Sequence, residues 1–155
     1  MTRLLRSALL LATALALVAG SGCGSDTKAS NDYVGAINKA QTDFAASITN
    51  MKATPAGTGA KQAAGDVFAN LKTAIDKVIS DLKAVKAPDK VKDLHNELIS
   101  ELGTFNGAVQ KAGTALKTGD PQKILKAQST FATDASTVGT KLGQTIQAIN
   151  TKLQG

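Results

Sequence analysis

Few residues of this 155-residue chain could carry out chemistry, and the most reactive types occur once each. His95 is the only histidine and Cys23 is the only cysteine. A metal site built on two histidines is therefore excluded, as are the paired Glu-x-x-His motifs of helical metal sites. As a general base, His95 would need a nucleophile and an orienting partner, and no serine lies in a G-x-S-x-G turn. The sequence predicts no catalytic residue, no metal and no cofactor, so we expect a protein that is not an enzyme.

Carboxylates recur at helical spacing in one segment of the chain. Asp89, Asp93 and Glu97 follow one another at intervals of four, which would place them on one face of a helix. Oxygen ligands of this kind bind hard cations such as Ca²⁺. However, Lys90 and Lys92 lie among them, and no loop of Asp, Asn and Gly residues of the calcium-binding type is present. These acids are typical of a solvated helix face.

The single cysteine follows a segment with the three-part plan of a secretory signal. Two arginines, Arg3 and Arg6, precede an apolar run over residues 8–19 that only Thr13 interrupts, and the small residues 20–22 come next. The run is shorter than the roughly 20 apolar residues that a membrane-spanning helix needs. The pattern predicts that residues 1–22 are a signal peptide and that the chain is exported.

Cys23 and the small residues before it resemble the lipobox of bacterial lipoproteins. The resemblance implies that Cys23 is diacylated (palmitate or a similar acyl chain), becomes the N-terminus, and holds the protein on the extracytoplasmic face of the cell membrane. It covers about 23 residues. Members of the family usually carry Leu three positions before the cysteine, where this chain has Gly20. Cleavage by ordinary signal peptidase therefore remains the alternative.

Charge and composition argue against nucleic acid as a partner. The formal net charge is +6, but both arginines lie in the export segment, which leaves 18 − 2 = 16 lysines against 12 acids. Tryptophan is absent. Recognition of nucleic acids relies on arginine forks and stacking aromatic rings, and the exported part has no arginine. The 155 − 22 = 133 remaining residues fit a single domain.

Apolar residues repeat at spacings of three and four from residue 31 onward, the pattern of helices with one buried face. The breakers are the segment 54–59, Pro88 and the pair Gly119-Asp120. The sequence therefore predicts an all-α domain over 31–155, preceded by a flexible tether at 23–30, with helices over about 32–52, from 60 to before 88, over 88–117 and from 121 onward.

Short connections between long amphipathic helices favour antiparallel neighbours, so the predicted fold is an up-down-up-down four-helix bundle. The alternative is a pair of helical hairpins that completes its core by dimerising, and the oligomeric state stays open. Each predicted helix carries one phenylalanine at a similar depth, roughly 12 to 18 Å from the distal end at 1.5 Å per residue. A packed aromatic layer is one interpretation, and an apolar pocket beside the layer is the other. The four rings are Phe44, Phe68, Phe105 and Phe131.

The same topology predicts that the turn around Pro88 lies at the tether end, beside the membrane. Four lysines surround this turn, and lysines near an anionic leaflet each contribute about 1 kcal/mol to membrane association. A solvated helix end is the alternative reading of the cluster. The residues are Lys83, Lys86, Lys90 and Lys92.

These features predict a lipid-anchored, non-enzymatic interaction or structural module of the cell envelope, with an unknown protein or the cell wall as its partner. The alternative is a carrier or sensor that binds a small apolar ligand in the bundle core. The exported region resembles the small helical lipoproteins of high-GC Gram-positive bacteria, with a proline turn at Ala87-Pro88 leading into the helix that carries His95. That resemblance implies a location and a fold but no activity.

Overall fold

The computed structural model describes residues 25–49 and 60–154, and these residues form helices joined by short turns. No strand occurs in these two ranges, so the predicted all-α class is confirmed. The helices are α2 (Ser25–Thr49), α3 (Ala60–Ala84), α4 (Lys92–Thr118) and α5 (Pro121–Gln154), with a 3-10 turn η1 (Asp89–Val91) before α4.

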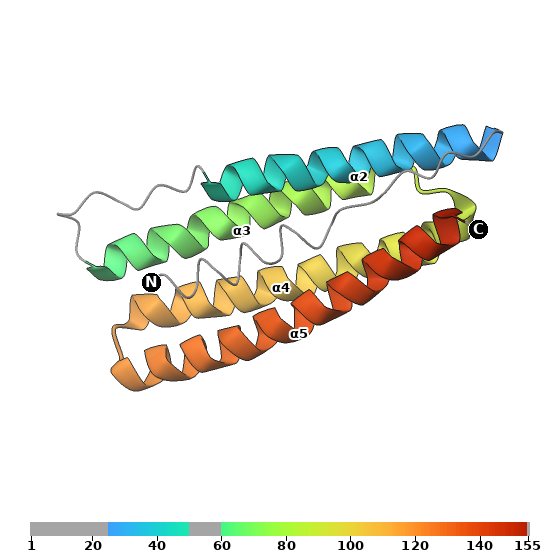
Figure 1. Cartoon of the computed structure of the whole chain (residues 1–155). Coiled ribbons are helices and arrows are strands. Elements are labelled where there is room, and N and C mark those ends of the chain that lie inside the picture. Colours follow the sequence, from blue (N-terminus) through green and yellow to red (C-terminus); the bar gives the residue numbers. More distant parts are fainter. Residues whose placement is uncertain (1–24, 50–59, 155) are drawn as a thin grey trace.

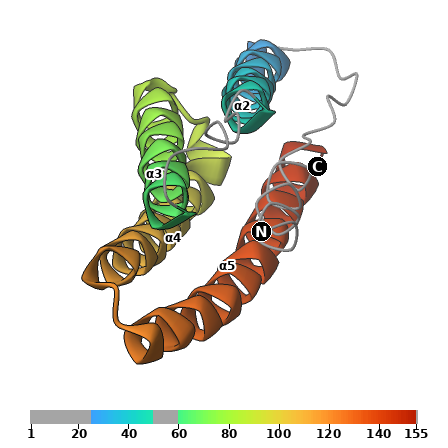
Figure 2. The same cartoon turned by 90° about the vertical axis from the view of Figure 1, so that its left-hand side faces the viewer.

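The four helices run antiparallel to their neighbours in chain order, which confirms the predicted up-down-up-down bundle (Figure 1). Extensive packing joins α2 to α3, α3 to α4, and α4 to α5. Between α2 and α5 the described residues share at most a marginal contact. Figure 2 accordingly shows the helices following one another around an arc, with α2 and α5 at its two ends. The α4–α5 pair has the most extensive packing, and none of the described helices covers its outer side, the side that faces away from α2 and α3 (Figure 2).

The connection between α4 and α5 has the geometry that its residues predict. Gly119 has a φ of 72°, a left-handed conformation that glycine adopts without steric penalty, and it ends α4. Asp120 Oδ1 then accepts hydrogen bonds from the backbone N–H groups of Gln122 (2.9 Å) and Lys123 (3.3 Å). These are the first free donors of α5, and Pro121 itself has no N–H to satisfy.

The start of α2 differs from the prediction. The tether was expected to cover residues 23–30, whereas α2 is helical from Ser25. Ser30 is buried, and Lys28 pairs with Asp32 one turn later at 2.6 Å. These contacts tie the first turns to the bundle and to the rest of the helix, so residues 25–30 belong to the fold. Cys23 and the predicted signal peptide lie outside the described residues.

The start of α4 also differs, because no α-helix begins at Pro88. The N–H of Val91 donates to the carbonyl of Pro88 at 2.9 Å and closes the 3-10 turn. Val91 itself has a φ of −123° and a ψ of 5°, outside the helical region, and its side chain is buried. This buried valine fixes the turn against the bundle, and α4 begins one residue later.

The core consists of the apolar faces that the spacing predicted, extended by two residues at the start of α2. These are Tyr33 and Val34, which precede the predicted apolar face of α2 in the sequence and are also buried. Leu94, Leu116 and Leu153, which the pattern also assigned to the core, are only partly buried. The fully enclosed large side chains come from all four helices and from η1: Tyr33, Ile37, Ile75, Leu82, Val91, Leu98, Phe105, Val109, Leu142 and Ile149.

Candidate functional site

The four predicted membrane-facing lysines are grouped at one end of the bundle, which we call the lysine end. All four side chains are exposed, on the last turn of α3, the following turn, η1 and the first residue of α4. Lys90 Nζ donates to the carbonyl of Leu153 at 3.4 Å, so the C-terminal turn of α5 lies at this end as well. Asp89 and Asp93 are interspersed, which leaves an excess of positive charge. Whether these lysines contact lipid stays a prediction.

The start of α2 lies at the lysine end of the bundle, as a series of buried hydrogen bonds shows. Tyr33 of α2 lies with its hydroxyl 3.2 Å from Nδ1 of His95 on α4, and Nε2 of His95 lies 3.1 Å from the carbonyl of Leu82 on α3. A carbonyl can only accept, so Nε2 carries the proton, and Nδ1 accepts from the Tyr33 hydroxyl. The chain therefore ties three helices together close to the predicted anchor.

The side chain of His95 is buried in the bundle, with 5% exposed. Burial lowers the pKa of His95 because it disfavours the imidazolium ion, while the hydrogen bond to the Leu82 carbonyl acts in the opposite direction. Burial also raises the pKa of Tyr33 to about 12. Both ring nitrogens of His95 are engaged, so the arrangement supports a structural role.

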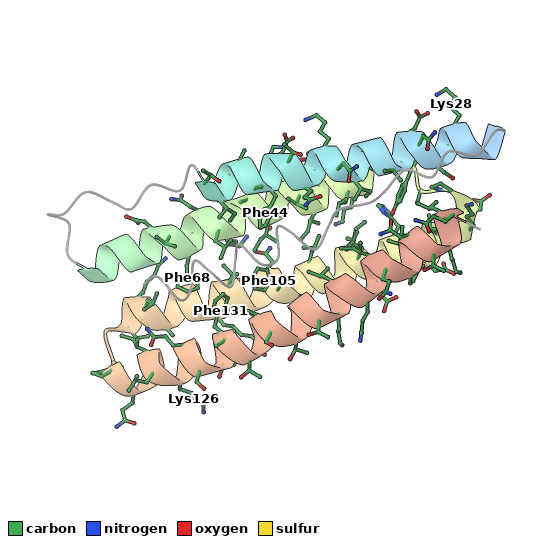
Figure 3. All side chains as sticks on the ribbon, viewed as in Figure 1. Lys28, Phe44, Phe68, Phe105, Lys126 and Phe131 are labelled. Atoms are coloured by element: carbon green, nitrogen blue, oxygen red, sulfur yellow. The ribbon has the colours of Figure 1, made fainter. Side chains whose placement is uncertain are left out.

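Three of the four phenylalanines form one aromatic cluster between α3, α4 and α5 (Figure 3). The ring centroids of Phe68 and Phe131 lie 5.3 Å apart in an edge-to-face arrangement, and those of Phe105 and Phe131 lie 5.9 Å apart in a stacked one. Phe44 is buried on α2, and within the described residues no ring stacks on it. The predicted layer is thus a packed contact of three rings, with Phe131 at its centre.

A groove of about 650 Å³ runs between α4 and α5 on the outer side of this pair, and the sequence analysis did not predict it. Its lining is rich in charged and hydroxyl side chains and in small residues, with no aromatic ring. The α4 side consists of Glu97, Ser100, Glu101, Gly103, Thr104, Gly107, Ala108 and Lys111, and the α5 side of Asp134, Thr137, Val138 and Lys141.

Glu101 is the buried charge of this groove. Only 8% of the residue is exposed, and its Oε1 accepts a hydrogen bond of 3.3 Å from the Thr145 hydroxyl of α5. Its Oε2 is shielded from solvent and has no hydrogen-bond partner within the described residues. Burial raises the pKa of Glu101, Glu97 raises it further, and Thr145 and Lys141 oppose the shift. The ionised carboxylate is therefore held in an unfavourable environment.

The surface charges of the described residues are paired in some places and unpaired in others, with the four lysines of the lysine end among the unpaired ones. Elsewhere Lys39, Lys72 and Lys77 each pair with an aspartate four residues later, at 2.5 to 2.8 Å. None of the five charged groups that line the groove forms an ion pair with another described residue. The groove thus combines unpaired charges with a buried, half-satisfied carboxylate.

Tyr33 and Glu101 were not predicted as site residues, but the sequence contains a pattern that indicates the burial of each. Tyr33 continues the apolar spacing of α2, because it lies four residues before Ile37. Glu101 lies three residues after the core residue Leu98 and directly before Leu102, a position on the edge of the buried face. Two of the small groove residues, Gly103 and Gly107, follow it with i, i+4 spacing.

Comparisons with protein-family models, curated proteins and solved structures give no match for this chain. In the described ranges, no three His, Cys, Asp or Glu side chains are grouped so that they could hold a metal ion. None of the described helices is both long enough and apolar enough to cross a membrane.

Replacing Glu101 with methionine is expected to stabilise the protein by about 1 kcal/mol at neutral pH, because it removes a buried acceptor without a partner. The folded-state pKa of Glu101 is raised, so its protonated form favours folding and its ionised form opposes it. The gain should accordingly shrink as the pH falls through the raised folded-state pKa of Glu101, and it should be smallest once the pH is below the ordinary glutamate pKa. Urea denaturation at several pH values measures it.

Glu97→Met is the matched control for this measurement, because Glu97 is exposed on the same helix. We expect it to change stability by less than about 0.5 kcal/mol. Equal effects of the two variants, or a loss of stability in Glu101→Met, would contradict the unfavourable environment assigned to Glu101.

Proposed function

We propose that this chain is a lipid-anchored, non-enzymatic module of the cell envelope, held on the extracytoplasmic face of the membrane through Cys23. The observation that carries the proposal is the position of the lysine end. The first described helix begins at Ser25, two residues after Cys23, and its start lies at the same end of the bundle as the four exposed lysines. A lipid on Cys23 would therefore hold the lysine end against anionic headgroups.

This geometry supports a standing orientation of the bundle on the membrane. Two residues span at most about 7 Å, so the anchor and the helical domain would be close together. The bundle would then extend away from the membrane, with the outer side of α4 and α5 accessible to a partner in the envelope. The aromatic cluster, in which Phe131 contacts two other rings, supports a packed core in that region.

Replacing Cys23 with alanine is expected to release the protein from the membrane fraction and to abolish incorporation of an alkyne-labelled palmitate. Two acyl chains, at about 0.8 kcal/mol per buried methylene, bind far more strongly than the lysines could. Fractionation of cells that produce each variant measures the effect. Ser21→Ala, a change between two small residues beside the cysteine, is the control and should remain membrane-bound and labelled. A Cys23→Ala variant that stays in the membrane fraction like the parent contradicts the proposal.

Replacing the four residues of the lysine end with serine is expected to weaken association of the unlipidated protein with anionic vesicles at least about tenfold at low salt, since each lysine contributes about 1 kcal/mol. Salt should reduce the difference, because it screens exposed charges. Co-sedimentation with vesicles of phosphatidylglycerol and phosphatidylcholine measures the association. The matched control removes four exposed lysines near the opposite end, and an equal loss there would contradict the assigned orientation. The control residues are Lys111, Lys117, Lys123 and Lys126.

A further inference from the structure

We propose that the start of α2, residues 25–34, is an acid-sensitive tether, which is helical while His95 is neutral and unwinds when His95 takes up a proton. Unwinding releases the bundle from its position against the membrane. The effect at the membrane rests on the proposed anchor at Cys23, whereas the unwinding depends on described residues alone. The two can therefore fail separately.

Few buried side chains hold the start of α2 to the bundle. Between residues 28 and 36 the buried ones are Ser30, Tyr33 and Val34, and the continuous apolar face begins at Ile37. Tyr33 is the largest of the three, and its hydroxyl lies 3.2 Å from Nδ1 of His95 on α4. Terminal turns with few buried contacts open at a low cost in free energy. The contact between Tyr33 and His95 is therefore a main support of the helical start.

The contacts of His95 suit the neutral ring and not the imidazolium ion. Nε2 donates to the carbonyl of Leu82, which at the end of α3 also accepts from the N–H of Val85 at 2.9 Å. Nδ1 accepts from the Tyr33 hydroxyl. A proton on Nδ1 turns this acceptor into a donor, so the hydroxyl has to turn its hydrogen away from the ring and loses its acceptor. Protonation thus removes the bond that holds the start of α2.

Within the described ranges, no charged side chain offsets a positive charge on His95. Burial lowers the pKa of His95, and the opposing effect comes from the Leu82 carbonyl, with no contribution from a charged group. On α3, Asp81 is paired with Lys77 at 2.6 Å. The other charged residues near this level of the bundle, from α2 to α5, are exposed: Lys28, Asp32, Lys83, Lys86, Asp89, Lys90, Lys92, Asp93, Glu97 and Lys152. A buried imidazolium without a counter-charge is costly, and exposure to water relieves the cost.

Unwinding of the start of α2 supplies this exposure. The ring of Tyr33 packs edge-on against the ring of His95, with centroids 5.6 Å apart, so its departure opens His95 to solvent. It also lengthens the tether. The helix begins two residues after Cys23, a span of at most about 7 Å, whereas an unwound segment from Cys23 to Val34 extends to about 36 Å. Acid would therefore free the lysine end from the membrane surface.

The test is hydrogen exchange of backbone amides, read by mass spectrometry, on the protein extracted from its own membrane in detergent. After correction for the intrinsic pH dependence of exchange, opening of residues 25–34 is expected to rise as the pH falls below about 6.5, by at most about tenfold per pH unit for one proton. It should level off below the lowered pKa of His95. Residues 60–154 should keep their protection.

Glu101 does not account for such an opening, although its pKa is also shifted. Its pKa is raised, so its protonation favours the folded state, and its hydrogen bond goes to Thr145 of α5 and not to α2. An equal rise in exchange in every helix, or none in residues 25–34, overturns the proposal. The comparison is made within the parent protein, so it does not depend on the folding of a variant.

Two variants separate the protonation of His95 from other effects of acid. His95→Gln keeps a donor and an acceptor and does not titrate, so exchange of residues 25–34 should show no pH dependence beyond the intrinsic one. Asp32→Asn is the matched control, because it removes an exposed carboxylate of the same segment, which pairs with Lys28 at 2.6 Å. It should keep the response of the parent. A parent-like response in His95→Gln, or its loss in Asp32→Asn, overturns the proposal.

Discussion

Replacing Phe131 with alanine is expected to lower the free energy of unfolding by about 3 to 5 kcal/mol, the range found when a buried phenylalanine is removed. Phe131 contacts the rings of Phe68 and Phe105, so its loss opens a cavity at the junction of α3, α4 and α5. The edge-to-face and stacked ring contacts would be lost as well. Urea denaturation followed by circular dichroism measures the change.

The control for this experiment is Leu125→Ala on the same helix. Leu125 is 67% exposed, so its truncation is expected to cost less than about 0.5 kcal/mol. Similar losses in the two variants would mean that the aromatic cluster does not organise the core.

Benzene distinguishes a packed aromatic cluster from a ligand pocket. An apolar cavity of the size left by Phe131→Ala can bind benzene, which would raise the melting temperature of the variant. The parent protein is expected to show no such rise, because its rings occupy the space. A rise in the parent would favour the carrier or sensor function over the interaction module.

Replacing Tyr33 with phenylalanine is expected to cost about 1 to 3 kcal/mol at neutral pH, because it leaves a buried acceptor without its donor. The acceptor is Nδ1 of His95, whose other ring nitrogen is already engaged with the Leu82 carbonyl. The ring of Tyr33, which also packs edge-on against the His95 ring at 5.6 Å, would remain in place. Urea denaturation again provides the measurement. A cost below about 0.5 kcal/mol would show that the hydroxyl is not needed to satisfy His95.

The same buried chain is expected to make stability depend on pH in the mildly acidic range. The pKa of His95 is lowered in the folded state, so the unfolded chain takes up a proton more readily. The stability due to neutral His95 is complete above the unfolded pKa of about 6.5 and is lost as the pH falls through the lower, folded-state pKa. Glu101 has the opposite sign, since its folded-state pKa is raised.

His95→Gln isolates this contribution, because glutamine can donate to the Leu82 carbonyl and accept from Tyr33 without titrating. The difference in free energy of unfolding between the parent and this variant should change as the pH falls below 6.5, in favour of the variant. A difference that is constant with pH would mean that His95 is not held neutral by burial.

The sequence by itself determined the helices and their order. The spacing of the apolar residues predicted which face of each helix is buried. Three consecutive residues predicted where α4 ends and α5 begins, because each acts through its own backbone and its near neighbours: Gly119, Asp120 and Pro121. The antiparallel order followed from short connections, and with it the position of the lysine end beside the start of α2. The sequence also predicted the signal peptide and the lipid on Cys23, which lie outside the described residues.

Only the tertiary structure decided which polar residues are buried and what they contact. His95 contacts Tyr33, which lies 62 positions earlier in the chain, and also Leu82, which lies 13 positions earlier. Glu101 and Thr145 meet across 44 residues. Periodicity assigns a residue to a face of its own helix, but the rotation and register of neighbouring helices determine whether the edge of that face is covered. The groove between α4 and α5 exists for the same reason, because small residues on one helix leave space only where the facing helix does not fill it.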